Sequence, residues 1–224
     1  MTEAEEEFKR YHDRLRRELN ESDMHFAIVK YISNVSNDYL KELNQSPGFW
    51  GLTMNSHISS TLMHLNNLFG KGAKEKHLHM RSFLDFTKEN LCIFSREVFE
   101  KRLRAINRYD ELASDFDSQI TIEKVEQDIE KLNGLPISGL KAWRNRILSH
   151  LDKDSVKDNI NIAKKYPVKT RHIAEIIETL DNMLNDYCLA FDFSTHYRGL
   201  AIEGGIKYIL DAIRFRQETQ KKSR

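Results

Sequence analysis

Only 3 prolines and 9 glycines interrupt this chain of 224 residues. Proline removes a backbone donor and glycine frees the backbone, so both residues tend to end regular elements. Their scarcity predicts long uninterrupted segments, and apolar residues recur along these segments at the three- and four-residue spacing of a helix. Strict apolar–polar alternation over a strand length does not occur in the sequence. We therefore expect an all-α fold.

The periodic segments and their punctuation predict a bundle of about seven to nine helices. No linker rich in proline, glycine and serine divides it, so we expect residues 1–224 to form a single helical domain, with a frayed tail over 218–224. The expected N-terminal caps are Ser22 or Asp23, Ser95 and Thr121. The predicted helices cover 3–19, 22–43, 49–69, two short segments within 78–106, 121–133, 136–151, 170–191 and 196–217.

Charge and cysteine content limit the class of function. The chain has 35 basic and 34 acidic residues, so RNA or DNA contact is expected only from local clusters and no role at a membrane surface is expected. No stretch is apolar enough to span a bilayer, and the N-terminus is acidic, unlike a signal peptide. Cys92 and Cys188 have no CxxC spacing and are expected to be buried free thiols. The expected compartment is the cytoplasm.

Several other features favour ordinary structural interpretations. The basic runs Arg10–Arg17 and Arg102–Arg108 are interleaved with acidic or apolar residues, which predicts solvated helix faces. The pair Gly204-Gly205 predicts a kink or a close-packing point in the last helix. Core positions are predicted for Leu52 and for the aromatic residues Phe83, Phe86, Phe94, Phe99, Phe191 and Phe193.

The nine histidines raise the question of a metal site. His57 and His64 share a helix face, but seven residues place them about two turns apart, too far to chelate one ion together. His77 and His79 form the tight pair of the sequence, and no nearby cysteine or histidine completes it. We expect surface or loop histidines, no metal and no cofactor.

The helix expected over 136–151 is the segment that bears on function. Leu140, Trp143 and Ile147 recur at the spacing of a buried stripe, and Arg144 falls inside this stripe. An arginine on an apolar face needs a partner or an interface, because an unpaired buried charge is costly. From the residues alone, Arg144 can equally be the partner of a buried carboxylate, and His150 a helix-end histidine that interacts with the helix dipole.

The segment Arg144-Asn145-x-x-x-x-His150 resembles the R-x(4–6)-H signature of the HEPN superfamily (higher eukaryotes and prokaryotes nucleotide-binding). The wider string over 141–152, which reads KAWRNRILSHLD, is similar to the abortive-infection U-type branch of that superfamily. The resemblance implies a HEPN-like helical bundle. It also implies a metal-independent endoribonuclease that acts as a homodimer in phage defence or a toxin–antitoxin system, with RNA and a cognate antitoxin protein as candidate partners.

The resemblance also implies roles for individual residues. His150 is the implied general acid or base, because the ordinary pKa of histidine suits proton transfer near neutral pH. Arg144 is implied to hold the scissile phosphate, and Asn145 to orient one of these two side chains. On residue chemistry alone, the candidate RNA contacts are Lys141, Arg146 and Ser149. Two alternatives stay open: a non-catalytic HEPN module that binds RNA, a nucleotide or a protein, and a structural helical domain.

Overall fold

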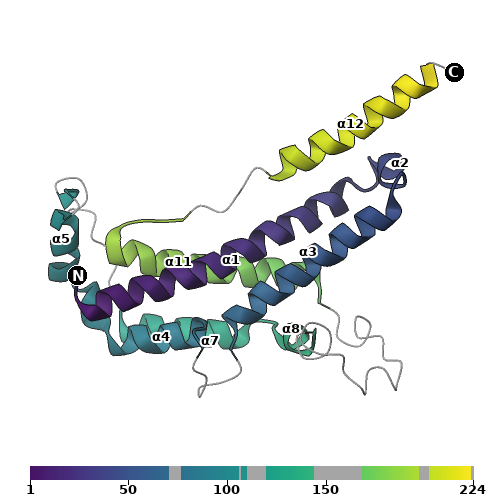
Figure 1. Ribbon diagram of the computed structural model, residues 1–224. Helices are drawn as coiled ribbons and strands as arrows, with labels where there is room; N and C mark the ends of the chain where they lie inside the picture. The colour runs from purple at the N-terminus through teal and green to yellow at the C-terminus, as the bar shows by residue number, and fades with distance from the viewer. Residues whose placement is uncertain (71–76, 106, 110–119, 144–167, 197–201, 223–224) are drawn as a thin grey trace. The chain divides into compact units, whose positions relative to one another are not determined.

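The computed structural model describes residues 1–70, 77–105, 107–109, 120–143, 168–196 and 202–222. Over these ranges the chain forms helices and no strand, which confirms the all-α multi-helix prediction (Figure 1). The elements are α1 (Glu3–Val35), α2 (Leu40–Leu43), α3 (Pro47–Leu68), α4 (Met80–Glu89), the 3-10 helix η1 (Leu91–Phe94), α5 (Arg96–Ala105), α7 (Ile122–Gly134), α8 (Ser138–Trp143), α11 (Thr170–Asp192) and α12 (Ile202–Lys222).

The chain divides into two compact units, and α1 and α3 each contribute residues to both. Unit 1 comprises Met1–Leu19 and Leu65–Tyr197. Unit 2 comprises Asn20–His64 and Arg198–Arg224. The single-domain organisation expected for residues 1–224 stays a prediction.

Helix α1 is longer than predicted. It begins with a capping box, in which the Glu5 N–H donates to Thr2 Oγ1 at 3.3 Å and the Thr2 N–H donates to Glu5 Oε2. It then continues through the position where a new helix was expected to start at Ser22. That prediction is wrong because the buried Ser22 hydroxyl donates to Thr61 O at 3.2 Å and so joins two helices of unit 2 instead of capping one.

Other predicted boundaries are confirmed. The predicted helix over 49–69 is α3, and the break near Glu89 separates α4 from η1 and α5. Thr121 caps α7 by accepting the Lys124 N–H at 3.2 Å, and Ser95 accepts the Val98 N–H at 3.4 Å at the start of α5. The long C-terminal helices are present as α11 and α12, but α12 runs from Ile202 to Lys222. The predicted helix start at residue 196 is therefore wrong, and residues 218–222 of the predicted frayed tail are helical.

Unit 1 is built around an aromatic core. The ring of Phe8 from α1 lies 5.4 Å from Phe83, 5.1 Å from Phe94 and 4.6 Å from Phe191 by ring centroids. Tyr187 of α11 adds an edge contact to Phe83 at 5.6 Å. These residues come from α1, α4, η1 and α11, so aromatic packing fixes four elements together. The predicted core positions Phe86 and Phe193 are only half-buried.

Unit 2 has a smaller core. Its buried members are Ile32, Tyr39, Trp50 and Leu210, with half-buried apolar residues packed around them. Leu52 is 70% exposed, so its predicted core position is wrong. A side chain added at Gly204 or Gly205 would meet nothing within 4 Å, so this pair is no close-packing point.

Candidate functional site

The predicted motif helix begins where the sequence indicates. Helix α8 starts at Ser138, two residues after Pro136, and Leu140 is buried as its place in the apolar stripe requires. The Leu140 carbonyl accepts a hydrogen bond from the Asn66 side chain of α3 at 3.3 Å, which ties α8 into unit 1. The buried position predicted for Leu140 is therefore confirmed, while Trp143, the next residue of the predicted stripe, is half-buried.

The chemistry predicted for this helix lies further along the chain. Residues 144–167 lie outside the described residues, and with them the candidate catalytic side chains Arg144, Asn145 and His150 and the candidate RNA contacts Arg146 and Ser149. Lys141 lies in α8, and its side chain is outside the description. The assignments of all six residues stay predictions.

A cavity of about 460 Å³ lies beside the start of α8 in unit 1. It is formed by the ends of α3 and α7, the start of α4 and the first residue of α8. Its lining is apolar at Leu68, Phe69, Leu132 and Ile137, with polar groups from His79 and Arg81. His79 accepts the Ser82 N–H at 3.1 Å and so caps α4, while the half-exposed Arg81 pairs with Asp85. A cavity of this volume, lined by both apolar and polar groups, falls in the size range of small-molecule sites.

Two arginines that were expected on solvated faces are buried in unit 1. Arg102 donates to Glu5 Oε1 at 2.7 Å, to Phe191 O at 2.7 Å and to Ile93 O at 2.8 Å. Arg16 pairs with Asp181. The solvated-face prediction is wrong for these two positions because each guanidinium satisfies its charge on a carboxylate from a distant segment, which spacing along one helix does not reveal.

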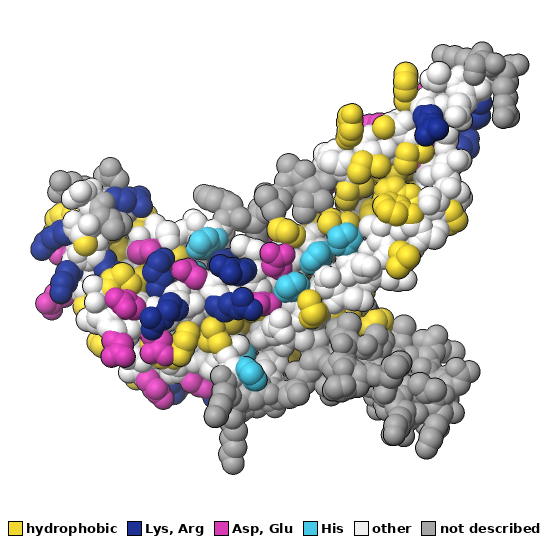
Figure 2. Space-filling view, in the orientation of Figure 1, with side chains coloured by type: hydrophobic (Ala, Val, Ile, Leu, Met, Phe, Trp, Pro, Cys, Tyr) yellow, Lys and Arg dark blue, Asp and Glu magenta, His cyan; other side chains and the backbone are white. Residues whose placement is uncertain are grey.

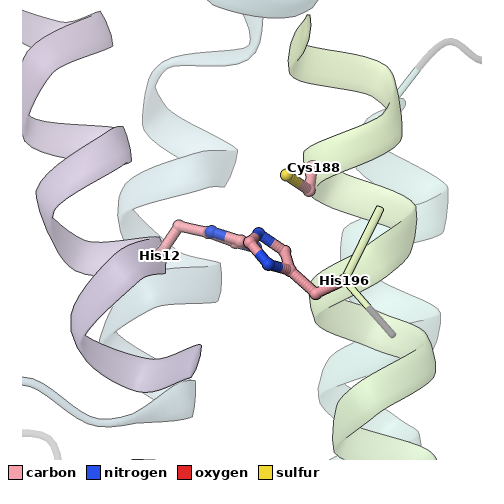
Figure 3. Close-up of side chains that lie close together, drawn as sticks. All are labelled: His12, Cys188 and His196. Carbon is pink, nitrogen blue, oxygen red and sulfur yellow. The ribbon is translucent and has the colours of Figure 1, made fainter. Parts of the chain in front are cut away.

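A cluster of His12, Cys188 and His196 also lies in unit 1, with the two rings and the thiol close together in Figure 3. The His12 Nε2 is 2.9 Å from Leu184 O, and Cys188 Sγ is 2.9 Å from Ser194 Oγ. Burial lowers the pKa of His12, and the guanidinium of Arg16 lowers it further. Burial also raises the pKa of the Cys188 thiol. The imidazole of His12 and the thiol of Cys188 are therefore uncharged, and each has a hydrogen-bond partner. We interpret the cluster as a packed polar contact close to the guanidinium of Arg16.

Cys188 is buried as predicted, whereas Cys92 is exposed, so the prediction for Cys92 is wrong. The predicted surface location is also wrong for His12 and His79, which are 3% and 5% exposed. Each has a specific hydrogen-bond partner, and this allows an imidazole to be buried.

A second histidine cluster lies in unit 2, between α1 and α3. His25 Nδ1 is 2.7 Å from His57 Nδ1, and the rings of His25 and His64 stack with centroids 5.9 Å apart. Ligand atoms of Glu21, His25 and His64 lie within 4.8 Å of one another. Figure 2 shows a row of histidine side chains on the visible face. Spacing along the sequence missed this cluster because His25 reaches it from a different helix.

The helical fold and the Arg144–His150 spacing point to the HEPN class. Comparison with known families identifies the branch of this class. The sequence matches the HEPN family model AbiU2 over residues 5–214. The chain therefore belongs to the AbiU2 family and is an abortive-infection HEPN module. No curated protein and no solved structure gives a significant match. Among the described helices, none is both long and apolar enough to cross a membrane.

Proposed function

We propose that this chain is a metal-independent endoribonuclease that acts as a homodimer in phage defence or a toxin–antitoxin system. The observation that carries the proposal is the Arg144-Asn145-x-x-x-x-His150 motif in a chain that matches the AbiU2 family over 5–214. Support also comes from α8, whose buried Leu140 sets the face on which Arg144 would continue.

The proposed reaction needs an acid–base group and a fixed positive charge. His150 takes the proton of a ribose 2′-hydroxyl, whose oxygen attacks the adjacent phosphorus, or gives a proton to the departing 5′-oxygen. The products are a 2′,3′-cyclic phosphate and a free 5′-hydroxyl. Arg144 contacts the non-bridging phosphate oxygens and stabilises the charge that grows on them, while Asn145 orients one of the two side chains.

A dimer is proposed because a two-fold axis would present the same motif helix twice in one cleft. Separately, unit 2 offers apolar surface for the association of two chains: seven of the nine exposed large hydrophobic side chains of the described residues belong to it. These include Tyr208, Ile209 and Phe215 of α12, and Figure 2 shows apolar side chains gathered in the region of α12. A second copy of this chain is the proposed occupant of this surface.

The activity is tested by incubating the full chain with end-labelled RNA in EDTA. We expect cleavage that falls at least about 100-fold in His150→Ala and in Arg144→Ala, within the range for loss of an acid–base or charge-stabilising group. His77→Ala and Arg96→Ala are matched controls, since both change exposed side chains, and they should cleave normally. Cleavage retained in both motif variants, or cleavage of the matching DNA, would refute the proposal.

Expression in a host gives an independent readout. Toxicity that His150→Ala relieves supports the same assignment, and toxicity that persists in this variant contradicts it. Light scattering at micromolar concentration tests the dimer: Phe215→Lys should lower the measured mass, and Ile122→Lys, which changes an exposed residue of unit 1, should leave it unchanged. A monomeric wild-type chain would rule out the shared cleft.

A second candidate function is a HEPN module that binds a nucleotide without cleaving RNA. The cavity beside α8 favours it, because its volume suits a nucleotide and Arg81 could reach a phosphate. Equilibrium binding of labelled ATP or GTP to the wild type and to Arg81→Ala separates the two functions. Binding that depends on Arg81, in the absence of cleavage, supports the second.

A further inference from the structure

We propose that Glu21, His25 and His64 form a binding site for a divalent transition-metal ion of the Zn²⁺ type, which joins α1 to α3 in unit 2. The inference is independent of the proposed nuclease, because neither its residues nor its test involves RNA cleavage. It rests on the positions of three donor groups, on the contact that orients one of them, and on the chemistry of the donor set.

The donor set matches the preference of such ions. Two imidazoles and one carboxylate are the ligands of several catalytic zinc sites, which keep a further position for water. Glu21 and His25 are four residues apart on α1 and therefore share a face, and His64 comes from α3. Their ligand atoms lie within 4.8 Å of one another, so small side-chain rotations bring them to the roughly 3.4 Å separation that tetrahedral Zn²⁺ ligands have.

His57 orients the central ligand. The contact of 2.7 Å between His25 Nδ1 and His57 Nδ1 is a hydrogen bond only if one of the two nitrogens carries a hydrogen and the other does not. When His25 donates, its Nε2 keeps the lone pair that a cation needs. Metal-binding histidines usually donate their second nitrogen to a neighbouring acceptor in this way, and the acceptor fixes the ring. His57 is thus a positioning residue of the site.

The charge of the donor set also suits a cation. Glu21 contributes a carboxylate, and the two histidines contribute imidazoles, which bind metal in their neutral form. The cluster of unit 1 has no carboxylate among its three donor groups, and its surroundings carry charges of both signs, from Arg16 and Lys9 and from Asp13 and Asp192.

The exposure of the four side chains and the packing of the two helices that carry them also support the site. All four side chains are half-buried, which leaves an approach for an ion and for a water ligand. The ligands sit on two helices that pack through Ser22 and Thr61, so the backbone positions are set before metal binds. We therefore expect the ion to bridge the two helices and to raise the melting temperature of the protein.

The test is a titration of the purified, chelator-treated full chain with Zn²⁺, followed by calorimetry and thermal melting. The Cys188→Ser background removes the thiol of the other cluster. We expect one Zn²⁺ site, with affinity lowered more than 10-fold in Glu21→Gln and in His64→Asn, and 10- to 100-fold in His57→Gln. His77→Ala, which removes an exposed histidine elsewhere, should bind as the background does.

Circular dichroism shows whether each variant is folded, so that a loss of metal binding can be told apart from unfolding. The Glu21→Gln substitution preserves the shape of the side chain. Co²⁺ absorption in the original chain supplies a second readout: d–d bands without a thiolate charge-transfer band fit the proposed ligands. Zn²⁺ binding that is unchanged in the combined Glu21→Gln, His25→Asn, His64→Asn variant would overturn the proposal. So would a Co²⁺ thiolate band that disappears in Cys188→Ser together with all metal binding.

Discussion

Unit 1 and unit 2 differ in how completely they bury their apolar side chains. Unit 1 buries Phe8 at the centre of an aromatic cluster and satisfies its buried charges internally, as Arg102 does with Glu5. Unit 2 has a core cluster of four buried apolar residues and carries most of the large apolar side chains that the described residues expose. A helical unit that leaves such side chains in water gains less from folding alone.

The difference indicates where each unit obtains its stability. Unit 1 depends on residues that are distant in sequence and close in space. Unit 2 adds a partly exposed pair to its small core: Arg214 donates to Glu42 Oε1 at 2.7 Å and lies 4.2 Å from the Tyr39 ring centroid. Partly exposed pairs of this kind contribute about 1 kcal/mol or less. Unit 2 is therefore the part of the molecule in which a bound ion or a second subunit would change stability most.

The largest effect is expected for the buried ion pair of unit 1. Arg102→Ala should lower the free energy of unfolding by about 3–5 kcal/mol, because it leaves the buried Glu5 carboxylate without its charge partner and two carbonyls without a donor. Urea unfolding measures this. Arg96→Ala on the same helix removes an exposed pair with Glu100 and should cost less than about 0.5 kcal/mol. Equal losses in the two variants would contradict this account of unit 1.

Leucine truncation compares the two cores directly. Leu184→Ala in unit 1 should cost about 4 kcal/mol, and Leu210→Ala in unit 2 about 2 kcal/mol, although both side chains are fully buried. The smaller loss is expected because the half-buried neighbours of Leu210 can move into the space. Chemical unfolding of each variant, followed at two wavelengths, measures both losses in the free energy of unfolding. A cost for Leu210→Ala equal to that for Leu184→Ala would show that the core of unit 2 is as rigid as that of unit 1.

A buried hydroxyl of unit 1 gives a pH-dependent test. Tyr187 donates to Asp128 Oδ2 at 3.1 Å, and burial together with the Asp128 charge raises the pKa of Tyr187 far above its usual range. Tyr187→Phe should cost about 1–2 kcal/mol at pH 7, because the carboxylate loses one donor and keeps Lys124 and Lys131.

The sign of the pH effect follows from the direction of this shift. The folded protein holds the tyrosine proton while the unfolded chain releases it above about pH 10, so wild-type stability falls as the pH rises beyond that value. The phenylalanine variant lacks this loss, and the difference in melting temperature between the two proteins should shrink between pH 9 and 11. A difference that grows over this range would contradict the assignment.

The smallest effect is expected at a helix end. Thr121→Ala should destabilise the protein by about 1 kcal/mol, because the Lys124 N–H at the start of α7 loses its side-chain acceptor. Thr121→Ser keeps the acceptor and should recover most of the loss in thermal melting. If serine fails to recover it, the threonine acts through packing and not as a cap.

Sequence reasoning succeeded where the signal is local. Caps at Thr121 and Ser95 were predicted because the residue type and its distance from the apolar run are both visible in the sequence. The motif helix was located from Pro136 and the apolar spacing that follows it. It failed at Ser22, Arg16 and Arg102, whose positions depend on partners elsewhere in the chain.

One candidate site was visible in the sequence, and the other depends on a tertiary contact. The spacing of Arg144 and His150 is visible in the sequence alone, and it identified the family that the comparison then confirmed. The seven-residue separation of His57 and His64 predicts that these two residues alone do not chelate an ion. No pattern in the sequence places His25 beside them, because this contact joins residues 32 positions apart on two helices.

What the sequence determined by itself is the helical class, the family and the motif, since periodicity, capping and a short signature are properties of neighbouring residues. What only the tertiary structure decided is which charges are buried and which histidines meet. Glu5 and Arg102 are 97 residues apart and become partners only when α1 and α5 pack. Such pairing depends on the free energy of packing the whole unit, which local spacing does not encode.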